Sequence, residues 1–571
     1  MTTYILGING PYHDLSACLL RDGELCLAIE EERLTRVKHG KTATIDNAGQ
    51  LPTAAIRACL DAAGIELADV DHIGYSFVPE LRLRSAGDDP YTVDDSWGTP
   101  GGEARLFARL ADVPAQLSAL AGRDVGDRFR WLPHHLCHAA SAFFPSTFAE
   151  SAVLTVDGIG EHSSTWMGHG QDRRLTPLAE LEYPHSIGFL WEKLCQFIGF
   201  SEYDAGKVMG LSAYGDPRRY AARMERLVDR ASPGDPRFAA ELLRFRAPDF
   251  TALEELFSTP RRDRDEPLTQ VHRDIAAALQ QLTSQLVLAL AGHVAAATGS
   301  RRLCLAGGVA LNCLANYELM NSGLFDEIYV QPAANDAGTA LGAALYIHHV
   351  LLRQPRGFVM DHPFWGPEYD DAAIEAALRA ADVPSRRVDA MAPLVAGLLR
   401  DGNIVGWFQG RVEWGPRALG NRSLLADPRR ADMQDTLNRR VKQRESFRPF
   451  APSVLAEEAD AWFAIPRGCS SRATEFMEFT FPLRPGRGAQ IPAVTHVDDT
   501  SRIQVVRREQ NPRYHALISA FHELTGVPMV LNTSFNENEP IVCSPADALR
   551  TYQRAGMDYL VLGDHLVGPA A

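Results

Sequence analysis

The sequence predicts an α/β protein of two domains, and three observations support this prediction. The chain has 571 residues, whereas a single hydrophobic core usually stops growing at about 250–300 residues. A helix predicted over residues 53–64 and a strand over residues 72–77 fit an alternating α/β pattern. Segments rich in Pro and Gly near residues 354–367 predict a linker. We therefore expect one domain over residues 1–355 and a second over residues 356–571.

The composition argues against several classes of protein. The formal net charge of −15 and the pI of about 5.7 disfavour a general nucleic-acid or membrane-surface binder. Residues 1–14 contain no basic residue and no long apolar run, so we expect no signal peptide. No uninterrupted apolar stretch has membrane-spanning length. The nine cysteines are scattered without a CxxC pair, which favours reduced thiols in a cytoplasm. We expect a soluble cytoplasmic protein.

Two similar hairpins are predicted in the first domain. Asp22-Gly23 separates the apolar runs 16–20 and 25–29, which is a strong hairpin signal. The pattern returns where the apolar run 152–156 ends at Asp157-Gly158 and a strand-like segment follows. A duplicated hairpin of this kind is typical of the actin-like nucleotide-binding fold, in which two phosphate-facing hairpins surround one cleft. Two unrelated hairpins are the alternative, because short patterns recur by chance.

An HxxxH motif suggests a metal site. Pro133 indicates the start of a helix, so His134 and His138 are expected to share one face of it. Two imidazoles on one face can hold one metal ion, and Asp157 and Asp336, which follow predicted strands, are candidates to complete its coordination. The alternatives are histidines satisfied by hydrogen bonds and a helix-capping role for Asp336.

Other segments could contact anionic ligands. An apolar strand passes through Gly307 and Gly308 into a helix, which places backbone amides where a nucleotide phosphate or ribose could bind. Lys207 lies in a glycine-rich segment and could serve an anionic group, although a tight loop would explain those glycines equally well. The charged run 30–40 ends with Lys38 and His39, which could donate hydrogen bonds to a phosphate or carbonyl oxygen. Most such runs are solvated faces.

The second domain contains a local basic segment. Residues 411–448 include ten Lys or Arg against five Asp or Glu. Arginine binds phosphate in a bidentate manner, so the segment predicts a pocket for phosphorylated substrates. A nucleic-acid surface is the alternative. It is disfavoured because Gly, Pro and apolar residues are interleaved as in a folded pocket wall.

The motifs of the first domain together resemble those of a known group of proteins. The HxxxH motif, the Asp-Gly loop at Asp157, the Gly-Gly-Val-Ala segment at Gly307 and the Asn-Asp-Ala-Gly segment around Asp336 resemble the metal-binding, actin-like domain shared by the Kae1 family and the O-carbamoyltransferases. The resemblance implies a Kae1-like domain over residues 1–355 that binds metal and nucleotide and performs carbamoyl transfer.

The second domain makes the resemblance more specific. The GPRALGNRS segment at 415–423 and the LNTSFN segment at 531–536 closely resemble the carbamoyltransferases of antibiotic and Nod-factor biosynthesis. This implies a YrdC-like α/β domain over residues 356–571 that forms carbamoyl-adenylate. The chain departs from the family at Asn538, where Gly is usual before Glu-Pro. It also departs at residues 191–193, where a Tyr-containing helix is more common.

The resemblance implies an ATP-dependent O-carbamoyltransferase. Carbamoyl phosphate and ATP, with Mg, would give carbamoyl-adenylate, and the carbamoyl group would pass to a hydroxyl of a small natural product such as a sugar, aminoglycoside or macrolide-type antibiotic. The metal on His134, His138, Asp157 and Asp336 would be Fe(II), although this ligand set also suits other divalent ions. A homodimer is a further expectation, and no nucleic acid or membrane partner is expected.

Individual residues receive roles from the same resemblance. His13 is the predicted general base, because an imidazole with a pKa near neutrality suits that task, and Asp14 would orient it. A structural hydrogen-bonding role for His13 is the alternative. The other predicted catalytic residues are Lys38, Lys442 and Arg417. The predicted nucleotide- and carbamoyl-phosphate-binding residues are Gly158, Lys207, Gly308, Asn312, Arg417, Arg422, Lys442, Arg448, His496, Arg502, Asn532 and Ser534.

Two rival functions use only part of these features. An actin-fold small-molecule kinase or ATPase would use the loops of the first domain but would not explain the second. A non-catalytic partner in tRNA modification is the other alternative, and the net charge of −15 weighs against it. Loops near 79–105 and 162–205 are expected to cover the acceptor pocket and to decide which acceptor binds.

Overall fold

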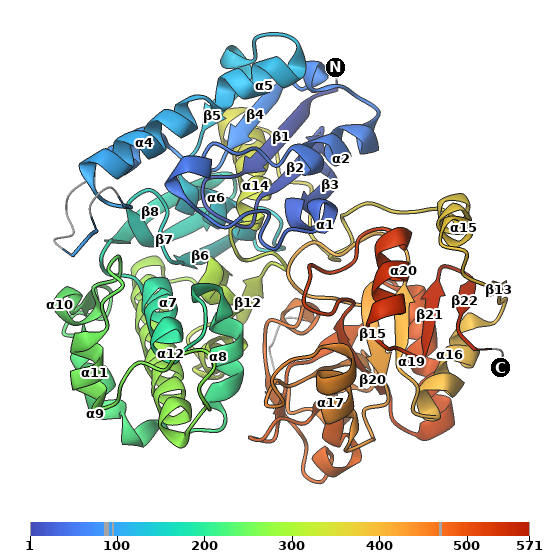
Figure 1. Ribbon diagram of the computed structural model, residues 1–571. Coiled ribbons are helices and arrows are strands. Elements are labelled where there is room, and N and C mark those ends of the chain that lie inside the picture. The colour runs from blue at the N-terminus through green and yellow to red at the C-terminus, as the bar shows by residue number, and fades with distance from the viewer. Residues whose placement is uncertain (1, 85–90, 94–95, 467–470, 570–571) are drawn as a thin grey trace. The chain divides into compact units, whose positions relative to one another are not determined.

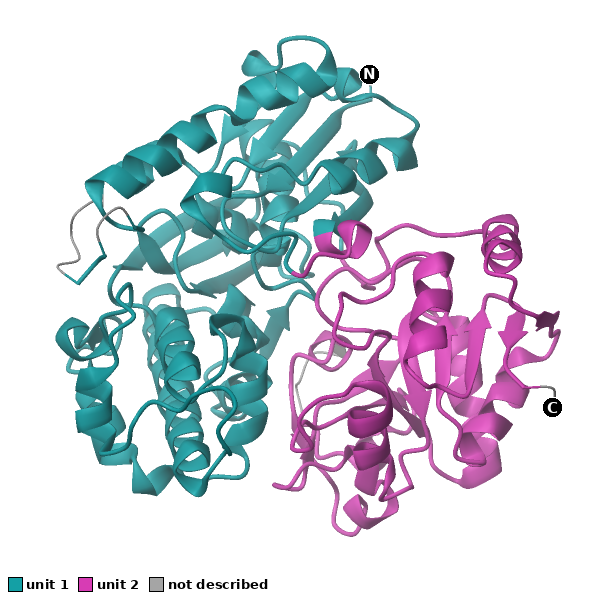
Figure 2. Cartoon of the chain, viewed as in Figure 1, with its two compact units in different colours: residues 1–31, 39–359 teal, residues 32–38, 360–571 magenta. Residues whose placement is uncertain are grey.

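The computed structural model describes residues 2–84, 91–93, 96–466 and 471–569 (Figure 1). The chain forms two compact units (Figure 2). Unit 1 comprises residues 1–31 and 39–359, and unit 2 comprises residues 32–38 and 360–571. The expected boundary after residue 355 lies close to the break after residue 359. Residues 32–38, which we had assigned to the first domain, belong to unit 2.

Unit 1 contains two five-stranded sheets with the same strand order, β3-β2-β1-β4-β5 and β8-β7-β6-β11-β12. In each sheet a three-stranded antiparallel meander continues into two parallel strands. This repeated topology confirms the duplicated actin-like fold predicted from the two hairpins. The strands are β1 (Tyr4–Asn9), β2 (Ser16–Arg21), β3 (Glu24–Glu30), β4 (His72–Tyr75), β5 (Phe129–Trp131), β6 (Glu150–Val156), β7 (Ser163–Gln171), β8 (Arg174–Glu182), β11 (Arg302–Ala306) and β12 (Glu327–Val330).

Two glycines let helix α14 (Gly338–Tyr346) lie close to strand β1 and to helix α6 (His134–Phe143), which carries the HxxxH motif. A Cβ on Gly342 of α14 would lie 1.8 Å from the carbonyl oxygen of Cys137, and a Cβ on Gly7 of β1 would lie 1.9 Å from that of Ala340. Any larger residue would therefore push α14 away from α6 and β1. The helices of unit 1 that matter for the site are α2 (Thr53–Ala63), α6 (His134–Phe143), α7 (Ile187–Phe197), α8 (Ala205–Ser212), α13 (Cys313–Asn321) and α14 (Gly338–Tyr346).

Helix α12 (Gln270–Thr298) is the one described helix that is long and apolar enough to cross a membrane by length and composition. Its most apolar window is 67% buried within the protein. Polar residues such as Gln280 and Thr283 interrupt the apolar sequence and are themselves buried. This pattern is typical of a central helix in a large α/β unit.

The region near residues 79–105 is not one long loop. Helix α3 (Pro79–Leu83) begins it and helix α4 (Pro100–Ala111) ends it, each with Pro in its first turn. Residues 85–90 and 94–95 lie outside the described residues. Between α3 and α4, Arg82 forms a bidentate ion pair with Glu103, both contacts being 2.8 Å. The predicted loops within 162–205 likewise contain β7, β8 and α7.

Unit 2 is an α/β domain around a mixed eight-stranded sheet of order β13-β22-β21-β14-β15-β20-β16-β19. This agrees with the expected YrdC-like second domain. Its strands are β13 (Ser385–Arg387), β14 (Val405–Phe408), β15 (Arg422–Ala426), β16 (Ala451–Leu455), β19 (Gln504–Val506), β20 (Met529–Ser534), β21 (Tyr559–Leu562) and β22 (His565–Val567). Its longer helices are α15 (Asp371–Ala380), α16 (Met391–Arg400), α19 (Pro512–Thr525) and α20 (Pro545–Arg554).

The charged run after β3 is anchored within unit 2 rather than being a solvated face. Arg33 is only 2% exposed and donates a 2.8 Å hydrogen bond to the carbonyl oxygen of Gly415. Arg36 donates to the carbonyl oxygen of Ile541 at 2.6 Å. These contacts fix the segment that ends with Lys38, so Lys38 belongs with the second-domain residues.

Candidate active site

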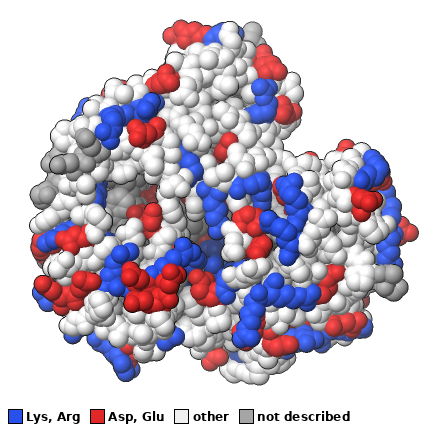
Figure 3. Space-filling view, viewed as in Figure 1, with Lys and Arg blue, Asp and Glu red and all other residues white. Residues whose placement is uncertain are grey.

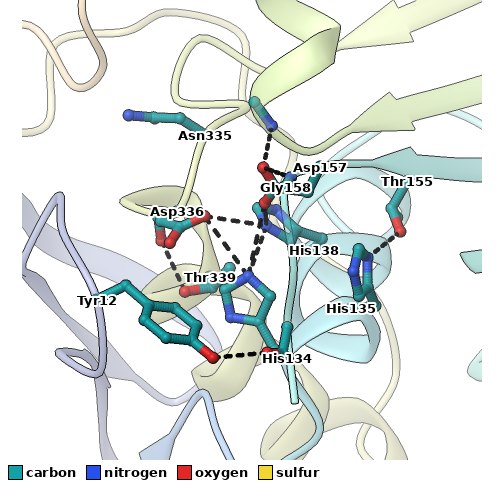
Figure 4. A network of polar contacts seen from close by, with 12 residues as sticks. Tyr12, His134, His135, His138, Thr155, Asp157, Gly158, Asn335, Asp336 and Thr339 are labelled. Carbon is teal, nitrogen blue, oxygen red and sulfur yellow. Dashed lines mark hydrogen bonds and ion pairs between the residues drawn. The ribbon is translucent and has the colours of Figure 1, made fainter. Parts of the chain in front are cut away.

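The four predicted metal ligands converge at one point of unit 1 (Figure 4). His134 and His138 lie on α6, and their Nε2 atoms are 3.1 Å apart. Asp157, which follows β6, places Oδ2 2.9 Å from His138 Nε2. Asp336, which precedes α14, places Oδ1 3.5 Å from each imidazole Nε2. One ligand atom from each residue lies within 4.8 Å of the others.

This cluster has the chemistry of a cation site. Both histidine side chains are fully buried, and two ring nitrogens face the same two carboxylates. Burial alone would lower the pKa of His134, but Asp336 and Asp157 outweigh it and hold that pKa well above its usual range. A metal ion could replace the shared protons, and two imidazoles with two carboxylates suit a divalent first-row metal. The residues present therefore fit a metal ion.

Backbone amides hold the ligand Asp157 in place. Gly158 N donates to Asp157 Oδ1 at 2.8 Å, and Gly308 N donates to the same oxygen at 3.2 Å. The second carboxylate oxygen is thereby left facing the histidines. The amide of Gly308 thus contacts Asp157, and its expected contact with a nucleotide phosphate stays a prediction.

A carboxylate that the sequence did not reveal caps helix α6. Glu161 accepts hydrogen bonds from the backbone N of His134 at 3.0 Å and from that of Val78 at 2.8 Å. The residue is 3% exposed and lies in the loop of the second hairpin, between β6 and β7. No motif marked Glu161, because its partners are 27 and 83 positions away in the chain.

Two further predicted binding residues of unit 1 have local partners. The Asn312 side chain caps α13 by accepting from Ala315 N at 3.0 Å, and it exchanges hydrogen bonds with Gln280 at 3.0 and 3.1 Å. Its side-chain amide has partners within the fold, and its expected role in nucleotide binding stays a prediction. Lys207 lies on α8 and forms an ion pair with Asp204 at 3.0 Å.

The predicted base His13 lies beside a network around Asp14. His13 Nδ1 is 3.2 Å from Asp14 Oδ2, within ion-pair distance. Asp14 also contacts His39 Nδ1 at 2.7 Å and accepts from Asn335 Nδ2 at 2.7 Å. Burial would lower the pKa of His13, but Asp14 outweighs it and raises that pKa to about 10. His13 must therefore lose a proton before it can act as a base.

A cavity of about 280 Å³ in unit 1 is lined by His13 and by the candidate metal ligands Asp157 and Asp336. Trp97, from the segment between α3 and α4, and Glu192, from α7, also line it. Both expected acceptor-pocket regions therefore contribute residues to this cavity.

Several of the predicted basic residues of unit 2 lie near Lys442. This lysine is 1% exposed, and its Nζ donates to the carbonyl oxygens of Ser534 at 2.5 Å and Asn536 at 2.8 Å. Burial lowers the pKa of Lys442 well below its usual range, and the neighbouring charges of Arg444, Arg448 and Lys38 lower it further. Lys38 and Arg448, both of which the sequence analysis names as site residues, thus lie close enough to Lys442 to lower its pKa.

A buried carboxyl group connects the other predicted basic residues. Glu478 is 1% exposed and interacts electrostatically with Arg417 and Arg502. Burial raises its pKa to about 7 against the opposing effect of these arginines. Arg502 also lies near His496, whose pKa is lowered to about 4 chiefly by burial. The sequence analysis missed Glu478, which stands in no recognisable motif.

Two motif residues of unit 2 make contacts that support the fold. Arg422 is fully buried, and its guanidinium lies 3.6 Å from the centre of the Phe408 ring. It donates to four backbone carbonyl oxygens, those of Gln409, Asn421, Gly410 and Cys543, at 2.6–3.2 Å. Asn532 is 1% exposed and donates to Ala418 O, Ser453 Oγ and Gln504 Oε1. Both residues thus have structural contacts, and the ligand-binding roles expected from the sequence stay predictions.

We expect Arg422→Leu to destabilise unit 2 strongly. The substitution leaves four buried carbonyl oxygens without their donor, which corresponds to a loss of about 3–5 kcal/mol in the free energy of unfolding. Urea denaturation followed by tryptophan fluorescence would measure this loss. Arg439→Leu is the matched control, because that side chain is 76% exposed, and a change below about 0.5 kcal/mol is expected. Unchanged stability of Arg422→Leu with lost nucleotide binding would restore the ligand-binding role.

Two family models match the chain, one for each unit. The family model described as carbamoyltransferase N-terminus matches residues 4–86 and 112–345, and the one described as carbamoyltransferase C-terminus matches residues 396–568. The nodulation protein NolNO of Sinorhizobium fredii is 40% identical over 560 residues, covering 97% of this chain and 79% of that protein. The nodulation protein NolO of Bradyrhizobium diazoefficiens is 42% identical over 438 residues, covering 76% of this chain and 78% of that protein.

Among solved structures, that of HypF from T. kodakarensis matches with a TM-score of 0.32 and 13% identity, covering 62% of this chain and 48% of that one. The two family models together span both units and most of the chain. The protein belongs to the carbamoyltransferase family.

Proposed function

We propose that this carbamoyltransferase uses ATP and carbamoyl phosphate to form carbamoyl-adenylate and transfers the carbamoyl group to a hydroxyl of a small molecule. The observation that carries the proposal is the presence of two different polar clusters, one in each unit. Unit 2 holds a buried lysine among arginines, and unit 1 holds a buried His and Asp cluster beside a cavity with a histidine. Each cluster suits one half-reaction.

In the first half-reaction, water releases phosphate from carbamoyl phosphate and leaves carbamate. A carbamate oxygen then attacks the α-phosphorus of ATP and displaces pyrophosphate, with Mg as the expected counter-ion of the nucleotide. Lys442, Arg448 and Lys38 are placed to offset the negative charge that develops on the phosphates. Arg417 and Arg502 supply further positive charge around Glu478.

In the second half-reaction, the acceptor oxygen attacks the carbamoyl carbon and AMP leaves. His13 takes the proton from the acceptor hydroxyl, and Asp14 holds the imidazole toward the cavity. Fe(II) or another divalent ion held by His134, His138, Asp157 and Asp336 would act as a Lewis acid for the carbamoyl group. The aromatic side chains in the wall of the cavity would limit the access of water, which would otherwise hydrolyse the adenylate.

The decisive experiment measures pyrophosphate and AMP formation by the purified protein without an acceptor. Pyrophosphate release from ATP that depends on carbamoyl phosphate is the expected result. Formation of ADP, with no dependence on carbamoyl phosphate, would overturn the proposal and favour a kinase or ATPase.

We further propose a small-molecule acceptor, not a nucleic acid, and a cytoplasmic location. Figure 3 shows Lys and Arg side chains lying among Asp and Glu side chains over most of the visible face. A tRNA-binding surface would instead favour a continuous basic patch. The eight cysteines that the structure describes are free thiols, which supports a reducing compartment, and Cys469 lies outside the described residues.

Asp14→Asn is expected to shift the pH dependence of carbamoyl transfer. The neutral form of His13 is the base, so transfer should accelerate as pH rises through the pKa of His13. Removing the Asp14 charge lowers that pKa, and the acidic limb of the pH–rate profile should move down by about one unit or more. The test is to measure single-turnover transfer from supplied carbamoyl-adenylate as a function of pH, over a range of about pH 6–10. An unmoved limb would exclude His13 as the titrating base.

A further inference from the structure

We propose that Glu192 binds a hydrogen-bond donor, a hydroxyl or an ammonium group, carried by the acceptor on the same ring as the hydroxyl that is carbamoylated. The acceptor would thus be a ring polyol or a ring amino alcohol rather than a simple alcohol. The inference rests on the proposed function of the unit 1 cavity and names the residue that selects its substrate.

Helix α7 holds Glu192 at a defined position over the loop that carries Asp157. Ser186 caps α7 by accepting from Phe189 N at 3.0 Å, and its hydroxyl donates to Gly158 O at 2.6 Å. A Cβ on Gly188 would lie 2.4 Å from Gly158 N, so the first turn of α7 packs directly on this loop. Glu192 follows Gly188 by four residues and therefore lies on the same face of the helix.

The carboxyl group of Glu192 points toward this loop and the cavity. Its Oε1 lies 3.3 Å from the position of a Cβ on Gly158. The side chain lines the cavity of about 280 Å³ together with His13 and Asp336. A small ring in this cavity can therefore contact both the base and Glu192.

Glu192 has no hydrogen bond or ion pair with another residue in the described part of the chain. Besides His13, three basic side chains share its cavity, and each has a contact elsewhere. Arg82 pairs with Glu103 at 2.8 Å, and Lys193 Nζ donates to the carbonyl oxygens of Ala247 and Asp249 at 2.7 and 2.9 Å. The guanidinium of Arg246 lies 3.8 Å from the centre of the Tyr183 ring. Burial raises the pKa of Glu192 to about 8, as expected for a poorly solvated carboxyl group. A donor on the ligand would supply the missing partner.

The rest of the cavity wall suits the body of a saturated ring. Tyr12 and Trp97 lie with their ring centres 5.6 Å apart, and Phe189 and Phe245 lie 5.8 Å apart. All four residues line the cavity. Apolar walls with convergent polar groups are typical of small-molecule sites, and His13 and Glu192 are two of the polar groups that line this cavity.

The test compares three six-membered ring probes: cyclohexanol, myo-inositol and trans-2-aminocyclohexanol. Binding to the full-length protein is measured by ligand-observed NMR, without ATP or carbamoyl phosphate. We expect the wild-type protein to bind the polyol or the amino alcohol about tenfold tighter than cyclohexanol, as one hydrogen bond to a buried carboxyl group allows. Tighter binding of the amino alcohol would identify an ammonium donor, and tighter binding of inositol a hydroxyl donor.

In Glu192→Leu this preference should fall to about twofold or less. Glu192→Gln keeps the shape and an acceptor oxygen, so it should retain any preference for inositol and lose any preference for the ammonium group. Glu255→Leu is the control, because Glu255 is exposed on α11 (Thr251–Phe257), and it should bind all three probes as the wild type does. Melting temperatures of all variants report whether they fold.

The inference is overturned if the wild-type protein shows no preference among the probes. It is also overturned if the preference survives in a folded Glu192→Leu variant. If Glu192→Leu does not fold, an ammonium preference that survives in Glu192→Gln overturns it. Failure of the proposed function is a separate result, because it would appear as pyrophosphate release that does not depend on carbamoyl phosphate.

Discussion

Lys442→Ala is expected to abolish carbamoyl-phosphate-dependent pyrophosphate release while leaving carbamoyl transfer from supplied carbamoyl-adenylate intact. The buried ammonium group of Lys442 is held by Ser534 and Asn536 at the centre of the basic cluster of unit 2. In this buried environment one lost cation should slow adenylate formation by about 10²–10³-fold. Rapid-quench measurement of AMP and pyrophosphate, with transfer measured separately, would show this split.

His13→Ala is the companion variant, and the opposite result is expected for it. Pyrophosphate release should persist and transfer should fall by about 10²–10⁴-fold, because only the second half-reaction uses the base. Arg439→Ala, an exposed basic residue of unit 2, serves as the control for Lys442→Ala and should retain both half-reactions. The division of labour between the two units would be wrong if Lys442→Ala and His13→Ala lost the same half-reaction.

His138→Ala is expected to remove the bound metal and with it the transfer reaction. The Nε2 atom of His138 lies 2.9 Å from Asp157 and 3.5 Å from Asp336, so its loss opens one side of the cluster. Changes to groups that merely support metal ligands cost about 10–100-fold in affinity, so the loss of a ligand should cost at least about 100-fold. Metal content per chain, measured by mass spectrometry after dialysis, is the primary readout.

A second histidine provides the control for this metal measurement. His169 lies on β7, contacts Glu150 at 2.6 Å and has a side chain that is 27% exposed. His169→Ala should therefore retain the wild-type metal content and transfer rate. Equal metal content in His138→Ala and the wild type would show that the cluster is held by hydrogen bonds alone, which was the alternative interpretation of the HxxxH motif.

Local spacing explains why much of the site could be predicted. His134 and His138 share a helix face because four residues make about one turn, and this holds whatever surrounds the helix. Asp157 was identifiable because an apolar strand ending in Asp-Gly predicts a loop at that point. The basic residues of 411–448 were identifiable by their density, although density alone did not separate Lys442, which lies in the cluster, from Arg422, which supports the fold.

The missed residues depend on contacts between distant parts of the chain. Glu161 caps a helix that begins 27 residues earlier, and Glu478 interacts with arginines that lie 61 positions before it and 24 after it. Glu192 was noted only as a departure from the family pattern. Its position in the cavity follows from the packing of α7 on the loop at Gly158, which no local pattern encodes.

The sequence by itself determined the fold class, the duplicated hairpins, the family and the four convergent metal-ligand candidates, because these depend on periodicity and short motifs. Only the tertiary structure decided that residues 32–38 belong to unit 2, that Gly308 holds Asp157, and that Arg422, Asn312 and Asn532 have hydrogen-bond partners within the fold. The physical reason is that a polar side chain acts on whichever partner burial brings near it. That partner is set by long-range packing, not by the neighbouring sequence.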